Sequence, residues 1–85
     1  LGEIDLIMRD GKYLVFVEVR SRSSSSFGGG IASITYAKRQ KIIKTASLYL
    51  MTHQINEQFP VRFDVISIDG KSESITWLKE AFYAF

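Results

Sequence analysis

The sequence predicts an α/β domain in which a mixed four-stranded sheet carries one long helix and a short C-terminal helix. Three observations predict this class. Two β-branched and aromatic runs flank an Asp-Gly pair near the start, a helical period covers residues 36–53, and apolar and polar residues alternate after Pro60. A hydrophobic content of 46% over 85 residues supports a single domain, residues 1–85, with a modest core.

The first expected element is a β-hairpin. Its strands are Gly2–Ile7 and Leu14–Arg22, and Asp10-Gly11 is a strong signal for the turn between them. Because side chains alternate along a strand, one face of the hairpin is apolar and the other face carries the charged residues. The apolar face is expected to consist of Ile4, Leu6, Met8, Val15, Val17 and Val19.

The charged face of the hairpin gathers acids at one end, beside Arg20. A two-residue loop places Glu3 opposite Glu18, with Asp5 opposite Phe16. A four-residue loop instead places Asp5 opposite Glu18. Two carboxylates about 4 Å apart repel by roughly 4 kcal/mol at an effective dielectric of about 20, so the pattern favours a compensating cation such as Mg²⁺. The alternative is an ordinary surface ion pair between Arg20 and Glu18, worth about 0 to 1 kcal/mol.

Residues 23–30, Ser-Ser-Ser-Ser-Phe-Gly-Gly-Gly, form a low-complexity segment after the hairpin. Only Phe27 among them can offset the entropy of ordering the chain, so we expect a flexible loop. Such a loop is either a plain connection or a flap that follows a nucleic-acid backbone, helped by Arg22 at its root. No phosphate-binding motif ending in Gly-Lys-Ser or Gly-Lys-Thr is present, which argues against P-loop nucleotide hydrolysis.

The helical segment, residues 36–53, has Thr35 as its expected N-cap and a surface histidine, His53, at its end. One apolar stripe is expected to pack on the sheet. The stripe consists of Ile42, Ile43, Ala46, Tyr49 and Leu50.

Four bases lie within seven residues of this helix, and no acid occurs between Glu18 and Glu57. At 100° per residue, Arg39 lies on the side of the apolar stripe and Lys38 at its border, near the positive end of the helix dipole. Both are therefore candidates for binding a phosphate close to the sheet. Lys41 and Lys44 point outward, where they are either solvated or contact a nucleic-acid backbone.

In the last third of the chain, the residue pattern predicts two strands, at residues 61–69 and 74–78, joined by a turn at 69–71. A loop at residues 54–60 is expected before them and a short helix at 79–85 after them. Asp64 is expected to be a structural partner of Arg62 or of a backbone amide. The aromatic residues at the end are expected to close the core instead of stacking on bases. They are Trp77, Phe82, Tyr83 and Phe85.

A net charge of +2 and a pI near 9.1 permit an anionic partner without requiring one. The chain has no cysteine, which excludes a disulfide framework and a thiolate zinc site. No signal peptide and no run of 18 apolar residues occurs, so we expect a cytoplasmic protein without a membrane partner.

Several segments share the features of one bacterial family: the run GEIDLIMRDGKYLVFVEVRSR, the Phe27-Gly28 pair, the Thr35-x-x-Lys38 helix start, Arg62–Val65 and the closing Ala81-Phe82. Together they resemble the YraN family over nearly the whole chain. The resemblance implies a restriction-endonuclease-like core, similar to that of the Holliday-junction resolvases. In those enzymes the active site is formed by an Asp on one strand and Glu-x-Lys on the next.

Asp5 and the run Glu18-Val19-Arg20 match that pattern, so the resemblance implies catalytic roles for Asp5, Glu18 and Arg20. It also implies that Asp5 and Glu18, with Glu3 nearby, hold Mg²⁺ or Mn²⁺. Arg20 stands where the pattern has lysine. Since arginine stays protonated, Arg20 cannot take a proton from water, but it can hold a phosphate or stabilise developing charge.

The function that the resemblance implies is metal-dependent cleavage of a DNA phosphodiester, including that of branched DNA. The nucleic-acid-binding candidates are Arg22, Lys38, Arg39 and Lys41. Two alternatives stay open: a nucleic-acid-binding module of the same fold that does not cut, and a structural or assembly module.

In the resembled family a helix and a further strand precede the Gly-Glu-Ile-Asp stretch. The sequence starts at Leu1, inside what reads as a strand, so we expect an N-terminally truncated domain without that helix and strand. A sheet lacking its covering helix exposes an apolar face and an unpaired edge, which favours a homo-oligomer.

Overall fold

Four strands and one helix follow one another along the described part of the chain. The computed structural model describes residues 4–22, 34–55 and 59–84. The elements are β1 (Leu6–Asp10), β2 (Tyr13–Arg22), α2 (Tyr36–Thr52), β3 (Val61–Asp69) and β4 (Ser74–Phe82). The sheet has the order β1-β2-β3-β4, with β2 and β3 parallel and the other neighbouring pairs antiparallel. The predicted α/β class with a mixed four-stranded sheet is confirmed, whereas the predicted loop 23–30 lies outside the described residues.

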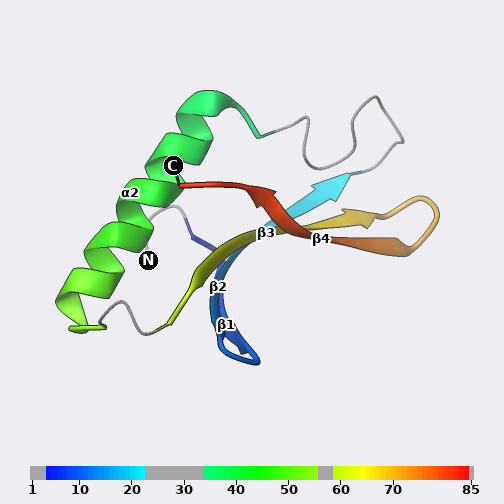
Figure 1. Ribbon diagram of the computed structural model, residues 1–85. Helices are drawn as coiled ribbons and strands as arrows, with labels where there is room; N and C mark the ends of the chain where they lie inside the picture. Colours follow the sequence, from blue (N-terminus) through cyan, green and yellow to red (C-terminus); the bar gives the residue numbers. More distant parts are fainter. Residues whose placement is uncertain (1–3, 23–33, 56–58, 85) are drawn as a thin grey trace.

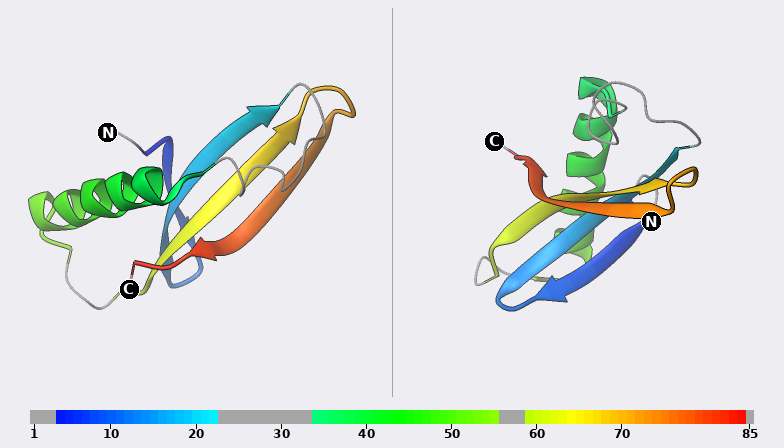
Figure 2. Two further views of the ribbon diagram at one scale, coloured as in Figure 1. Left: turned by 90° about the horizontal axis from the view of Figure 1, so that it is seen from above. Right: turned by 90° about the vertical axis from the view of Figure 1, so that its right-hand side faces the viewer.

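The helix α2 lies between β2 and β3 in the chain and packs on one face of the sheet (Figures 1 and 2). Parallel strands need such a crossover, because a tight turn cannot join them. The helix begins as predicted, since the Oγ1 atom of Thr35 accepts a hydrogen bond from the amide of Lys38 at 3.1 Å. The predicted stripe faces the sheet: Ile42 and Ala46 are buried, and the core also contacts Ile43, Tyr49 and Leu50.

Aromatic rings form the centre of the core between α2 and the sheet. The ring of Phe16 lies 5.7 Å from that of Phe63 in a stacked arrangement and meets Tyr49 edge-on at 5.9 Å. Phe63 in turn stacks on Phe82 at 5.1 Å. This row of rings joins β2, β3, β4 and α2, so the core depends on side chains from both ends of the chain.

The hairpin turn lies one residue later than the Asp10-Gly11 pair predicts. Asp10 pairs with Tyr13, so Gly11 and Lys12 form the two-residue loop. Gly11 has a φ of 59°, which suits the first central position of a primed turn. The pairing of Asp5 with Phe16 and of Glu3 with Glu18, predicted from a two-residue Asp10-Gly11 loop, is therefore wrong by two residues. The observed register is the one predicted for a four-residue loop, in which Asp5 lies opposite Glu18. A shift of two residues keeps the side chains within β1 and β2 on their predicted faces, because strand side chains alternate with a period of two.

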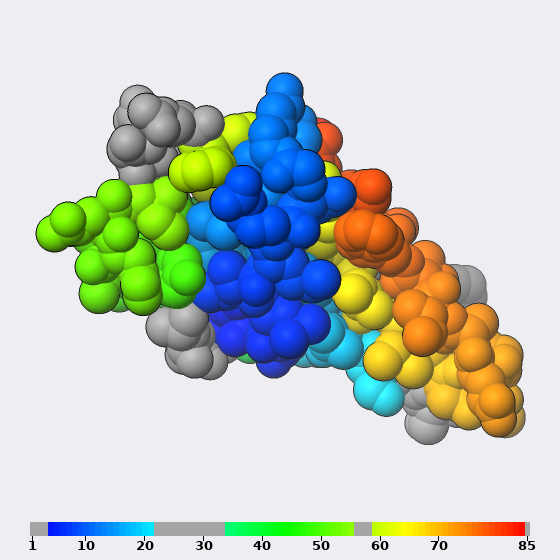
Figure 3. Space-filling view, turned by 90° about the horizontal axis from the view of Figure 1, so that it is seen from below, coloured from blue at the N-terminus to red at the C-terminus, as the bar shows by residue number. Residues whose placement is uncertain are grey.

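The sheet face away from α2 carries exposed apolar side chains. Figure 3 shows the molecule from below, with β1 in blue and β4 in orange at opposite edges of the sheet. Leu6, Met8 and Trp77 are about half exposed. Ile4 departs from the predicted apolar face, because it precedes β1 and is buried in the core on the helix side. A hollow of about 160 Å³ on the open face is lined by Met8, Arg9, Asp10, Val15, Val17, Ile66 and Trp77. In the described part of the chain, no helix is long and apolar enough to cross a membrane.

The predicted C-terminal helix at 79–85 is wrong, because β4 continues as a strand to Phe82. Phe63 pairs with Phe82 and Val65 with Leu78, so β4 bulges by extra residues opposite Asp64. Glu80 adopts a φ of 52° within this bulge. The bulge brings Phe82 into the core as predicted, whereas Trp77 and Tyr83 are exposed and do not close it. Phe85 lies outside the described residues.

Asp64 occupies the open side of the sheet as a fully hydrogen-bonded acid. Its carboxylate accepts two hydrogen bonds from Arg62 at 2.9 Å, one from the Trp77 indole at 2.8 Å and one from the Glu80 amide at 3.1 Å. Arg62 also donates to Asp10 on β1 at 2.9 Å. Burial alone would raise the pKa of Asp64, but these donors together lower it below its ordinary value. The expected structural role of Asp64 is confirmed.

We predict that Asp64→Asn lowers the free energy of unfolding at pH 7 by about 3 kcal/mol, because the buried Arg62 loses its buried charged partner and keeps only the more exposed Asp10. The folded-state pKa of Asp64 is lowered, so its stabilisation is present above the ordinary value near 3.8 and is lost as the pH falls through the folded value. Urea denaturation at pH 7 and at pH 3 should therefore show a difference between variant and wild type that shrinks in acid. The control is Asp10→Asn, which removes an exposed partner of Arg62 and should cost much less. Equal losses for the two variants would contradict the assignment.

Candidate functional site

Asp5 and Glu18 meet where β1 and β2 begin to pair. Leu6 pairs with Val17, so the register places Asp5 beside Glu18 on the face that α2 covers. The Oδ2 atom of Asp5 accepts a hydrogen bond from the amide of Val19 at 2.9 Å, which fixes the carboxylate against β2. The two acids thus share one face, as the sequence predicts, but they are direct neighbours only because of the observed register.

Glu18 is a buried acid between two cations. Its side chain is 5% exposed, and its Oε2 atom lies 3.3 Å from Arg20 Nη1 and 3.8 Å from Lys38 Nζ. The other oxygen, Oε1, is buried and has no hydrogen-bond partner among the described residues. A buried carboxylate oxygen without a donor is costly, so the site is suited to a further positive group.

The protonation of Glu18 reflects this setting. Burial raises the pKa of Glu18 above its ordinary value, and the neighbouring Asp5 carboxylate raises it further. Lys38 and Arg20 act in the opposite direction without cancelling the increase. The folded protein therefore binds a proton at Glu18 more readily than the unfolded chain does.

The basic side chains of α2 lie on the sides of the helix that a period of 100° per residue predicts. Lys38 and Arg39 are half-buried toward the sheet, whereas Lys41 and Lys44 are exposed. The Nε atom of Arg39 is buried and has no hydrogen-bond partner among the described residues. The structure therefore brings together Asp5, Glu18, Arg20 and Lys38. The candidates Glu3 and the side chain of Arg22 lie outside the described residues.

The contact between Lys38 and Glu18 was missed by the sequence reasoning, which assigned Lys38 to a phosphate alone. Lys38 is twenty residues from Glu18 in the chain, so no strand or helix period relates the two. The sequence contains only indirect evidence for this contact. A helix that begins after Thr35 and connects two parallel strands has its first turn close to the end of the preceding strand, which carries Glu18.

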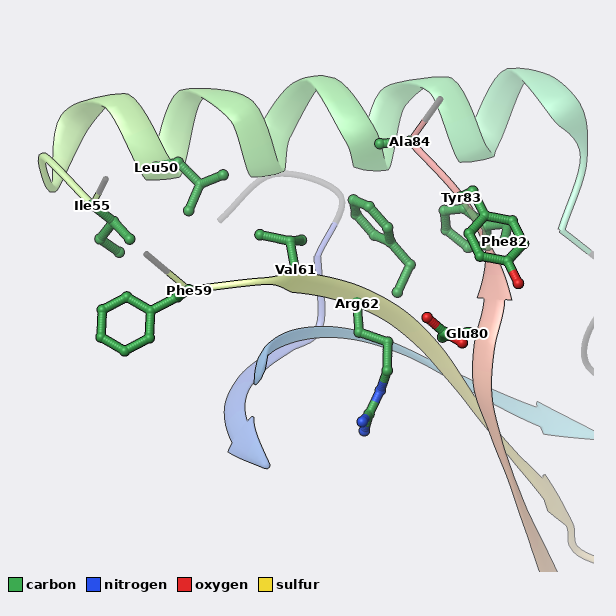
Figure 4. A pocket seen from close by; sticks show the side chains of 10 residues that line it. Leu50, Ile55, Phe59, Val61, Arg62, Glu80, Phe82, Tyr83 and Ala84 are labelled. Carbon is green, nitrogen blue, oxygen red and sulfur yellow. The ribbon is translucent and has the colours of Figure 1, made fainter. Parts of the chain in front are cut away.

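The larger of the two described cavities lies elsewhere and has a volume of about 520 Å³. It is formed by the C-terminal end of α2, the start of β3 and the end of β4. Apolar side chains such as Leu50, Ile55 and Val61 face it, and the guanidinium of Arg62 points away from it toward the opposite side of the sheet (Figure 4). It contains neither Asp5 nor Glu18. We therefore place the candidate site at the carboxylate pair, where charge and hydrogen bonding converge, and not at the larger cavity.

His53 does not contribute to the site. It is exposed at the end of α2, where its ring packs on Tyr49 with centroids 4.2 Å apart. The expected surface position at the helix end is therefore confirmed.

Comparison with known proteins assigns the chain to a family. The family described as "Uncharacterised protein family UPF0102" matches residues 1–68. A UPF0102 protein of Legionella pneumophila is 71% identical over 84 residues, which cover 99% of this chain and 71% of the relative. A UPF0102 protein of Xanthomonas campestris is 47% identical over 81 residues, which cover 95% of this chain and 66% of the relative. The chain belongs to the UPF0102 family, also called YraN, as its motifs predict.

We predict that Glu18→Gln raises the free energy of unfolding at pH 7, by on the order of 1 kcal/mol. The folded-state pKa of Glu18 lies above the ordinary value near 4.5, so its ionisation lowers stability as the pH rises from that value through the folded pKa. A glutamine carries no charge and avoids this cost. Thermal unfolding from pH 4 to pH 8 should show a stabilisation that grows with pH. The exposed Glu73→Gln is the control, and a destabilised Glu18→Gln variant would show that the contacts to Arg20 and Lys38 outweigh burial.

Proposed function

We propose that this protein is a metal-dependent DNA endonuclease whose site is formed by Asp5 and Glu18. The observation that carries the proposal is the pairing of two carboxylates on one face, one of them buried with an oxygen that has no donor among the residues that the structure describes. Natural proteins rarely retain such an acid for stability, and perturbed acids concentrate at functional sites. We place this proposed activity in the cytoplasm.

The donor set at the site fits a small divalent cation. Carboxylate oxygens are the ligands that Mg²⁺ and Mn²⁺ prefer, and Mg²⁺ is commonly held by one or two carboxylates with water and substrate phosphate as the other ligands. The residues that would hold the ion are Asp5 and Glu18, with Glu3 as the further candidate from the sequence. Within the described ranges, no group of three or more acids, histidines or cysteines converges, so water and phosphate would complete the shell. When bound, such an ion activates water for attack on a phosphodiester.

The basic side chains beside the carboxylates are suited to binding the phosphate group of a substrate. Arg20 presents a planar fork that can hold two phosphate oxygens, and Lys38 presents a point charge at the start of α2. Arg39 lies beside Lys38 with its Nε atom lacking a partner in the described part of the chain. These side chains would hold the substrate backbone next to the carboxylates.

A nucleic-acid-binding module that does not cut is the second candidate. The observation that favours it is the position of two cations beside one oxygen of Glu18, at 3.3 Å and 3.8 Å. Arg20 supports it as well, because a guanidinium cannot act as a base. Binding would then persist with a chelator present, and no cleavage would occur.

We predict that the full-length protein cleaves DNA in the presence of Mg²⁺ or Mn²⁺ and that Asp5→Asn abolishes cleavage. Asparagine retains an oxygen that can accept from the Val19 amide, so this variant removes the charge while leaving the local fold intact. Arg20→Lys should keep or raise cleavage, because lysine restores the nuclease pattern. The assay compares branched and linear DNA on a gel. Cleavage that survives in Asp5→Asn would indicate a contaminating nuclease and sink the mechanism.

We also predict that DNA binding depends on Arg39 and Lys38 more than on Lys44. The first two face the sheet, whereas Lys44 is exposed on the outer side of α2. Each phosphate contact that is removed should lower the slope of log affinity against log salt by about one unit, independently of sequence. Titrations of Arg39→Ala, Lys38→Ala and Lys44→Ala over a range of salt measure this slope, and equal losses for all three would contradict the helix-phase argument.

A further inference from the structure

The outer side of α2 carries an ordered row of residues, opposite the apolar stripe that packs on the sheet. Its members recur at intervals of four and three residues, which places them on one side of the helix over about 21 Å. We call this set the outer stripe, and it consists of Ala37, Lys41, Lys44, Leu48 and Met51. All five residues are exposed, and no other described element covers this side of the helix (Figures 1 and 2).

The outer stripe is divided into a basic half, Lys41 and Lys44, and an apolar half, Leu48 and Met51. Leu48 is 54% exposed and Met51 is 74% exposed. A single exposed apolar side chain is common, but two large ones that are neighbours on a helix surface form a patch. The stripe therefore combines positive charge with apolar surface along one line.

The lysines of the outer stripe have no acid to neutralise them. α2 contains no Asp or Glu, and neither Lys41 nor Lys44 forms an ion pair with a residue in the ranges 4–22, 34–55 and 59–84. Lys38 differs, because it reaches Glu18 on the sheet. An anionic partner would thus gain two ion pairs at Lys41 and Lys44 without breaking any that the described residues make.

The spacing of the outer stripe is that of a surface on which a second helix packs. Alternating intervals of three and four residues define the contact line of two helices that lie side by side. Along this line a partner can bury Leu48 and Met51, while the lysine stems pack beside it and their ammonium groups reach carboxylates at its edge. A sugar-phosphate backbone would neutralise the lysines but leave the apolar half in water. The pattern favours a helical protein partner.

A second copy of this chain does not complement the outer stripe. A two-fold interface would place the stripe against itself. Parallel helices would set lysines against lysines, and antiparallel helices would set them against Leu48 and Met51. Neither arrangement supplies a carboxylate, so the partner must be a different chain that carries its own acids.

We propose that the outer stripe binds an acidic amphipathic helix of another protein. The partner helix carries Glu or Asp beside Lys41 and Lys44, and Leu, Ile or Val against Leu48 and Met51. A single helix face buries less area than the interfaces of stable complexes, so the complex is transient, with a dissociation constant in the micromolar range. The proposal does not depend on nuclease activity, because the outer stripe faces away from the sheet that carries Asp5 and Glu18.

The test follows the backbone amide resonances of the isotope-labelled full-length protein during titration with synthetic helical peptides. The peptides have about 20 residues, because much shorter isolated helices are marginal in water. One peptide carries glutamates followed by leucines at the spacing of the outer stripe, and the other carries lysines in place of the glutamates. We expect the glutamate peptide to shift the resonances around Lys44 and Leu48 and to bind at least about tenfold more tightly than the lysine peptide.

Variants locate the contact on the outer stripe. Lys44→Glu should weaken binding of the glutamate peptide about tenfold and strengthen binding of the lysine peptide, because the reversal exchanges attraction for repulsion. Leu48→Ser should weaken the glutamate peptide about tenfold at every salt concentration, since an apolar contact is not screened. The control Lys71→Glu makes the same charge reversal at an exposed turn outside α2 and should bind as the wild type does. The amide spectrum of each variant also reports whether its fold is intact.

Three other outcomes would overturn the proposal. The first is an outer stripe that does not respond to the glutamate peptide, or that binds both peptides equally. The second is a response of the stripe to a DNA duplex or to vesicles of anionic lipid instead of the peptide, which would assign the surface to that ligand. The third is a shift of the same resonances with protein concentration alone, which would assign the surface to self-association.

Discussion

The parallel alignment of β2 with β3 is the constraint on which the rest of the structure depends. Parallel neighbours cannot be joined by a tight turn, so the chain must return across the sheet, and α2 makes that return. The helix thereby covers one face, buries Phe16 and Glu18 beneath it, and sets Lys38 beside the Glu18 carboxylate. The candidate site therefore lies in the same layer, between α2 and the sheet, as the hydrophobic core. The packing that forms this core also buries Glu18 and so raises its pKa.

The two buried acids in the described part of the sheet, Asp64 and Glu18, have opposite electrostatic surroundings. Asp64 accepts hydrogen bonds from Arg62, Trp77 and the Glu80 amide, and these donors lower its pKa despite complete burial. Glu18 has two cations on one oxygen and, within residues 4–22, 34–55 and 59–84, no donor on the other, and its pKa is raised. Similar burial thus leads to opposite electrostatic results. The number of donors around each acid, and not its depth, determines the direction in which its pKa is shifted.

Local patterns in the sequence predict the hairpin, the long helix and the third strand, together with most of their faces. The helical period identified the buried Ile42 and Ala46, and strand alternation placed Glu18 with Asp5. What could not be predicted depends on contacts distant in the chain. The hairpin register was two residues off because Asp10-Gly11 and Gly11-Lys12 both make acceptable loops. The strand at the end was mistaken for a helix, since the bulge at Glu80 is stabilised by Asp64, sixteen residues earlier.

The two-residue loop at Gly11 and Lys12 has an evolutionary consequence. An insertion of two residues in this loop, or a matched change in both strands, would keep Asp5 and Glu18 on the same side of the sheet. A single-residue insertion that shifted one strand would turn one acid toward the opposite face and separate the pair. Natural variation in the length of this hairpin should therefore occur in even steps or be absorbed by a bulge. Because strand side chains alternate between the two faces, only an even shift in the register of the hairpin keeps both carboxylates on one face.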